Sequence, residues 1–192
     1  MTASYLSHSL GEFLDLVARR QPAPGGGAVA AVTVSVAAGL VAMSGRYSTD
    51  LVEDGQRLVD AADRLRARAA GLADADADAY GAVIAAYAAA RHGDQVAGRE
   101  QVRAALVRAT EVPLEVAEVG AETARLAGLL AVEGKRDVRG DATTALLLAE
   151  AATRSAAHLV AVNVEAGGGD KDLVRRAAAS VAAARDAAAR VE

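Results

Sequence analysis

The stretch Pro22-Ala-Pro-Gly-Gly-Gly-Ala-Val-Ala-Ala-Val-Thr-Val-Ser-Val-Ala-Ala-Gly-Leu-Val-Ala-Met43 decides the fold of this chain. Proline fixes φ and glycine permits positive φ, so the first six residues predict a rigid, tight entry into a helix. From Gly25 to Met43 only Thr33 and Ser35 have polar side chains. We therefore expect a helix that is buried on nearly every side, in a bundle, at a dimer interface, or in both.

The composition favours an all-α fold. Hydrophobic residues make up 53% of the chain but aromatic residues only 3%, so the core must consist mainly of Ala, Val and Leu. Alanine is the best helix former, and no segment shows the alternation typical of strands. We predict a single domain over residues 1–192, folded as an antiparallel bundle of roughly five to six helices.

Charge and residue usage exclude several classes of function. The net charge of −4 argues against a nucleic-acid partner, which would need a concentrated basic surface. The absence of cysteine excludes disulfides and thiolate catalysis, and the scattered His8, His92 and His158 predict no metal site. The N-terminus lacks a signal-peptide pattern and the apolar helix lacks flanking aromatic anchors, so we expect a soluble, cytoplasmic protein that does not enter a membrane.

Local signals predict where the helices begin and end. Ser9 and Glu12 have the spacing of a capping box, and residues 48–50 are expected to cap the third helix. Pro113 inside the fourth helix predicts a kink or a break. The expected helices cover about residues 10–20, 25–46, 50–91, 96–132, 141–165 and 170–191, with residues 92–94, a charged loop at 133–140 and the glycines at 167–169 between them.

One acidic side chain interrupts an apolar stripe. Asp76 lies in the middle of residues that repeat every 3.6 positions along the third helix, namely Leu58, Leu65, Leu72, Tyr80, Val83 and Tyr87. An acid that faces the core is costly unless it is paired or used in function. It could equally be a structural Asp that an arginine or a helix end holds.

Other polar residues also allow two interpretations. Asp141 follows Gly140 at a predicted helix start, where it is either an N-cap or a ligand-facing acid. The triplet Gly25–Gly27 can present backbone N–H groups to a ligand or let helices cross closely. Asn163 faces inward, so its amide needs partners in the core or at a pocket. Glutamates at 111, 115, 118 and 122 are expected to form an exposed acidic face.

These segments together resemble the cyclodeaminase/cyclohydrolase family of folate one-carbon enzymes. Pro22–Gly27 is preceded by Leu10-Gly-Glu-Phe-Leu14 and followed by the small-residue helix, and the residues around Asp76–Tyr80, Val112–Leu114 and Leu159–Asn163 extend the similarity. The resemblance implies a homodimeric bundle with a tetrahydrofolate derivative as substrate and no metal or prosthetic group. It implies Asp76 and Asp141 as catalytic residues, and Pro24, Gly25, Gly26, Gly27, Tyr80, Asn163 and Arg46 as substrate-binding residues.

The chain departs from the family pattern in one segment. After the buried helix the family has a lysine-rich cluster, whereas Ser44-Gly-Arg-Tyr-Ser-Thr-Asp-Leu51 has only Arg46. Lys135 and Gly140 also stand where asparagine and serine are usual. Two alternatives therefore stay open: an enzyme of the same fold that performs imine, iminium or methylene-transfer chemistry on a non-folate substrate, and a non-catalytic helical dimer.

Overall fold

The computed structural model describes residues 4–91, 95–167 and 169–191, so the predicted break at residues 92–94 lies outside the described residues. Within these ranges the chain forms helices and no strand, which confirms the all-α prediction. The α-helices are α1 (Leu10–Ala18), α2 (Gly26–Arg46), α3 (Gly55–Ala90), α4 (Gln95–Glu133), α5 (Arg139–Glu165) and α6 (Lys171–Ala188), with short 3₁₀ helices at Tyr5–Ser7 and Arg136–Val138.

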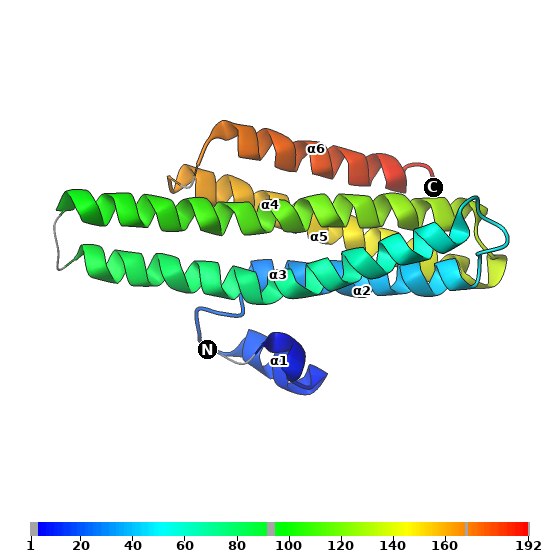
Figure 1. Cartoon of the computed structure of the whole chain (residues 1–192), viewed down its shortest axis with the longest axis horizontal. Coiled ribbons are helices and arrows are strands. Elements are labelled where there is room, and N and C mark those ends of the chain that lie inside the picture. Colours follow the sequence, from blue (N-terminus) through cyan, green and yellow to red (C-terminus); the bar gives the residue numbers. More distant parts are fainter. Residues whose placement is uncertain (1–3, 92–94, 168, 192) are drawn as a thin grey trace.

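Helices α2 to α6 form an elongated bundle in which successive helices run antiparallel (Figure 1). Helix α4 contacts all four others, and α2 lies between α3 and α5. Small residues let the helices approach closely. A Cβ on Gly45, for example, would lie 3.0 Å from Val59 of α3. The core is therefore built by backbone proximity more than by large side chains.

Helix α2 is less buried than its composition predicts. Ala31, Val34, Ala38 and Val41 are fully enclosed, but a strip along the outer side of the helix is open. We call this surface the α2 strip; it carries no charge, and Val36 at its centre is 54% exposed. The strip consists of Val29, Val32, Val36, Leu40 and Met43. Within one chain α3, α4 and α5 cover the other faces of α2 and leave this one partly open. Its burial at a dimer interface stays a prediction.

The N-terminal segment stands off from the bundle (Figure 1). The predicted capping box is present, since Glu12 N donates to Ser9 Oγ at 3.3 Å and Ser9 N donates to Glu12 Oε2 at 2.7 Å. Asp74 of α3 anchors the segment, because its carboxylate accepts from Tyr5 N at 2.8 Å. Leu10 and Leu14 on α1 remain 73% and 58% exposed.

Two predicted helix starts are wrong. Helix α3 begins at Gly55 rather than near residue 50, because Ser48 is engaged elsewhere: its Oγ donates to Ser44 O at 2.8 Å and accepts from Lys135 N at 2.9 Å. The expected loop before α5 contains a 3₁₀ turn that leads directly into Arg139. Asp141 therefore lies inside the first turn of α5 and is not its N-cap.

Helix α4 continues through Pro113 without the break that proline suggested. Proline has no N–H, so it cannot donate to the carbonyl four residues earlier. That carbonyl belongs to Ala109, and it accepts instead from Asn163 Nδ2 of α5 at 2.7 Å. A side chain from a neighbouring helix thus replaces the missing backbone donor.

Two segments, α2 and residues Arg136–Glu165, are long and apolar enough to cross a membrane by length and composition. Half of the apolar stretch of α2 is buried within the bundle. Core helices of soluble proteins have the same features, so our expectation that the protein does not enter a membrane stays a prediction.

Candidate functional site

Asp76 caps helix α2 from another helix. The N-cap residue of α2 is Gly25, which has no side chain with which to satisfy the free N–H groups of the first turn. Asp76 Oδ2 of α3 accepts from Ala28 N at 2.9 Å. The positive end of the α2 dipole also favours a carboxylate here. A helix end therefore holds Asp76, which was one of the two structural interpretations of its inward position.

Gly27 leaves the space that this carboxylate occupies. A Cβ built on Gly27 would overlap the carboxyl group of Asp76. The neighbouring Gly26 points toward α5 instead, where a Cβ would lie 3.9 Å from Leu159 Cδ1. Of these two glycines, only Gly27 is required to be glycine by the position of Asp76.

The electrostatics around Asp76 favour a proton-transfer group. Burial raises the pKa of the Asp76 carboxyl, and the hydrogen bond from Ala28 lowers that pKa in part. Among the described residues, no cation forms an ion pair with Asp74, Asp76 or Asp78. Burial also raises the pKa of the nearby Tyr5 phenol, with these three carboxylates adding to the shift. The region therefore suits a cationic ligand.

The raised pKa of Asp76 predicts how the stability of the protein changes with pH. An unfolded Asp titrates at about pH 3.9. Because the folded pKa is higher, Asp76 contributes stability that is present below about pH 4 and is lost as the pH rises through the folded pKa. Asp76→Asn lacks this loss. The free energy of unfolding of the variant should therefore rise relative to that of the wild type from about pH 4 upward. Urea denaturation of both proteins across this range tests the sign, and a constant or falling difference would contradict it.

The structure brings most of the predicted site residues to the N-terminus of α2. Pro24 and Gly25–Gly27 form the entry to the helix, and Asp76 lies against its first turn. Tyr80 follows Asp76 by one turn of α3 but is 47% exposed, as is Tyr87. The prediction that these two tyrosines face the core is wrong, because α2 begins at Gly26 and does not cover α3 beyond Asp76. Asn163 joins from α5, one turn after Leu159.

Arg46 and Asp141 lie at the opposite end of α2. Arg46 Nη2 pairs with Asp63 Oδ2 at 2.6 Å, and Asp141 is exposed beside Ala142, which packs in the same core cluster as Ala42. Ala28 and Ala42 are fourteen residues apart, which corresponds to about 21 Å along the helix. Within one chain, Asp141 and Arg46 therefore do not share a site with Asp76.

A pocket of about 910 Å³ opens between the N-terminal segment and α3, next to the Pro22–Ala23 turn. Asp76 is not among the described residues that line it, but its neighbours Asp74 and Asp78 are. Sequence reasoning missed these two because they lie off the apolar stripe. The alternation Asp74-Ala-Asp-Ala-Asp78 is the signal that could have identified them. Other lining residues are Tyr5, His8, Leu16 and Gln21.

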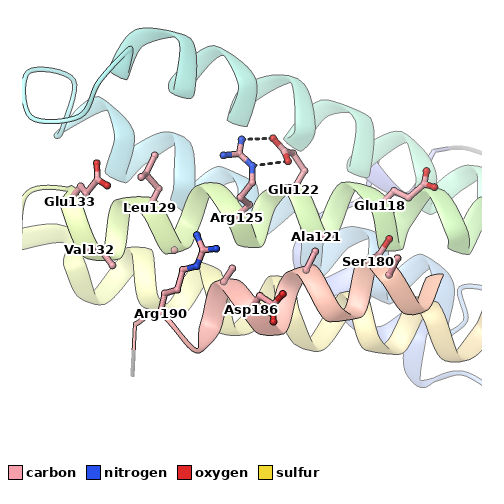
Figure 2. Close-up of a pocket in the computed structure, with 14 residues that line it drawn as sticks. Glu118, Ala121, Glu122, Arg125, Leu129, Val132, Glu133, Ser180, Asp186 and Arg190 are labelled. Atoms are coloured by element: carbon pink, nitrogen blue, oxygen red, sulfur yellow. Dashed lines mark hydrogen bonds and ion pairs between the residues drawn. The ribbon is translucent and has the colours of Figure 1, made fainter. Parts of the chain in front are cut away.

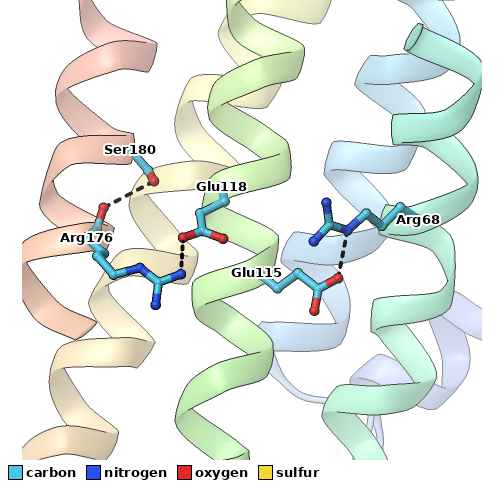
Figure 3. Close-up of polar contacts among 5 residues, drawn as sticks. All are labelled: Arg68, Glu115, Glu118, Arg176 and Ser180. Carbon is cyan, nitrogen blue, oxygen red and sulfur yellow. Dashed lines mark hydrogen bonds and ion pairs between the residues drawn. The ribbon is translucent and has the colours of Figure 1, made fainter. Parts of the chain in front are cut away.

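A second pocket, of about 750 Å³, lies between α4 and α6 and contains none of the predicted site residues (Figure 2). The predicted acidic face of α4 borders it, but that face is not simply acidic. Each glutamate pairs with an arginine, and two pairs join helices: Arg68 Nε to Glu115 at 2.8 Å and Arg176 Nη2 to Glu118 at 2.7 Å (Figure 3). Arg108 and Arg125 pair with Glu111 and Glu122 within α4. In the described part of the chain, no group of three His, Asp or Glu residues could hold a metal ion.

Comparisons with known proteins agree on one family. The family model described as formiminotransferase-cyclodeaminase matches residues 9–183. The chain is 34% identical over 161 residues to the methenyltetrahydrofolate cyclohydrolase of Methylorubrum extorquens, and the match covers 80% of this chain and 77% of that protein. It also superposes on the crystal structure of formiminotetrahydrofolate cyclodeaminase from Thermotoga maritima with a TM-score of 0.86 and 26% identity, covering 97% of this chain and 94% of the other.

Proposed function

Because this chain belongs to the formiminotransferase-cyclodeaminase family, we propose that it is a folate one-carbon enzyme that hydrolyses 5,10-methenyltetrahydrofolate to 10-formyltetrahydrofolate. The 34% sequence identity to a methenyltetrahydrofolate cyclohydrolase supports this choice within the family. The structural observation that carries the proposal is the half-buried carboxylate of Asp76, which has no cationic partner among the described residues and lies at the start of α2.

The substrate's chemistry fits such a carboxylate. The methenyl group is an amidinium cation, and an unpaired carboxylate stabilises it. We infer that Asp76 accepts a proton from water as the oxygen bonds to the methine carbon. It then returns a proton to N5 as the bond between that carbon and N5 breaks, and the hydroxyl proton leaves to solvent as the formyl group forms. A carboxyl with a raised pKa suits both transfers.

A cyclodeaminase activity is the second candidate, because the chain shares its fold over nearly its whole length with a cyclodeaminase. That reaction closes the same ring from formiminotetrahydrofolate and releases ammonia. It passes through a similar tetrahedral carbon, so the same Asp76 would serve.

One pair of assays separates the candidates. Loss of the methenyl chromophore, measured against the uncatalysed rate in buffer, reports cyclohydrolase activity. Release of ammonia from formiminotetrahydrofolate reports cyclodeaminase activity. A protein that is inactive in both assays and shows no thermal shift with any tetrahydrofolate derivative would contradict the proposal, and it would favour a non-folate substrate or a non-catalytic dimer. Asp76 and Asp141 lie far apart in one chain, so the test for a non-folate substrate or a non-catalytic dimer is worth making.

We also propose that the protein is a homodimer that buries the α2 strip. An uncharged apolar strip on α2 is costly to leave in water, and a second copy offers the same surface for a symmetric contact. The exposed Leu10 and Leu14 of α1 provide further apolar surface that no other described segment covers.

Val36→Arg should convert this dimer into a monomer, because it places a charge at the centre of the strip. Val132→Arg is the matched control, since Val132 on α4 is equally exposed, at 52% against 54%. Light scattering at micromolar concentration measures the mass of each variant. A wild-type monomer, or a Val36→Arg dimer as stable as the control, would show that the strip is not the interface.

A further inference from the structure

The only asparagine of the chain, Asn163, has one end of its side chain committed. Its Nδ2 donates to Ala109 O at 2.7 Å, and this carbonyl lacks its helical donor because Pro113 has no N–H. Ala109 is only 8% exposed, so its carbonyl has little access to water as a substitute partner. A buried acceptor without a donor is costly, so the hydrogen bond from Asn163 stabilises the fold.

The other end of the Asn163 amide is free. Its Oδ1 accepts no hydrogen bond from any described residue, and it is not among the fully enclosed polar atoms that lack a partner. The donor and acceptor of an amide lie on separate arms, so the bond to Ala109 O directs Oδ1 away from α4. Pro113 thereby determines which arm of the amide faces α4 and which faces outward.

The position of Asn163 places this free acceptor near the candidate site. Leu159, one turn earlier on the same side of α5, faces Gly26 at the start of α2. Asn163 therefore lies just beyond the N-terminus of α2, about 6 Å further along α5. Tyr80 takes the corresponding place on α3, one turn beyond Asp76.

We propose that Asn163 Oδ1 is a hydrogen-bond acceptor for the N–H edge of a pterin, and that Pro113 fixes its orientation. The identity of the ligand rests on the proposed folate function. The coupling between Pro113 and Asn163 does not. Pro113→Ala would restore the N–H that competes for Ala109 O, and the amide would lose its fixed orientation.

Stability measurements test the coupling. Asn163→Ala should lower the urea midpoint in the wild-type background, and by much less in the Pro113→Ala background, because the restored N–H then serves Ala109 O. His158→Ala, on the exposed outer side of α5, is the control and should behave alike in both backgrounds. Equal losses for Asn163→Ala in the two backgrounds would refute the coupling.

Ligand titration tests the acceptor. Asparagine-selective ¹⁵N labelling gives a single side-chain NH₂ signal, because the chain has one asparagine. This signal should shift when 5-formyltetrahydrofolate is added. Asn163→Ala should weaken the binding of this folate about tenfold, the scale of one hydrogen bond. Pro113→Ala should weaken binding several-fold while the protein stays folded, which a purely structural Asn163 does not predict.

Two further results would separate the possible failures. If the folate binds but neither variant changes its Kd and the NH₂ signal stays fixed, Asn163 only supports α4 and the acceptor role is refuted. If the wild type binds no folate, the pterin assignment is overturned along with the proposed function, whereas the stability cycle still decides the coupling.

Discussion

Asp76→Asn is expected to lower the rate of methenyl hydrolysis by about 10²-fold or more, the usual scale for loss of a general acid or base. Asparagine has nearly the same shape, and its Oδ1 can still accept from Ala28 N, so the cap on α2 and the fold should persist. The asparagine amide cannot act as a general acid or base. The measurement is kcat/KM beside the circular dichroism spectrum of the same preparation.

Asp60→Asn is the control for this experiment. Asp60 lies on the same helix, is exposed, and accepts only a side-chain hydrogen bond from Gln56 at 2.9 Å among the described contacts. Its variant should keep the wild-type rate. A fully active Asp76→Asn protein would mean that Asp76 is a structural cap, and that the proton-transfer group lies elsewhere.

Gly27→Ala should remove activity although it replaces no ionisable residue. The added Cβ would occupy the space of the Asp76 carboxyl, so the carboxylate must move and Ala28 N loses its partner. We expect a fall in rate approaching that of Asp76→Asn. We also expect a loss of about 0.5–2 kcal/mol in the free energy of unfolding from the lost cap, offset in part by the better helix propensity of alanine.

Gly26→Ala provides a closely matched comparison, because it is the same substitution one residue earlier in the same helical turn. Its Cβ would make an ordinary contact with Leu159 at 3.9 Å. The variant should lose much less activity than Gly27→Ala, and it should gain stability, by up to about 1 kcal/mol. Equal activities for the two alanine variants would show that the position of Asp76 against Gly27 has no role in turnover.

Sequence reasoning succeeded where a local pattern determines the structure. The run of small residues after the glycine triplet predicted α2, and the helical period identified Asp76 as the inward acid of α3. The capping box at Ser9 also formed as predicted. Each of these depends on residues within one continuous segment of the sequence.

It failed where a partner comes from a distant segment. Serine is a common N-cap residue, yet Ser48 accepts a hydrogen bond from the backbone N–H of Lys135, 87 residues away. The glutamates of α4 predicted an acidic face, because Arg68 and Arg176, which pair with two of them, lie on other helices. Nothing in the sequence indicated that Asp76 and Asp141 lie at opposite ends of α2 within one chain. Their catalytic roles stay predictions.

The cap that Asp76 forms on α2 links a reactive group to a backbone amide that can be observed directly. The Ala28 N–H lies 2.9 Å from the carboxylate, so its nitrogen and proton chemical shifts should follow the ionisation of Asp76 without any added label on the side chain. Exchange of the same proton with solvent would report how often the carboxylate leaves the helix end. The protein thus carries its own probe of the charge, and of the mobility, of the group to which we assign proton transfer.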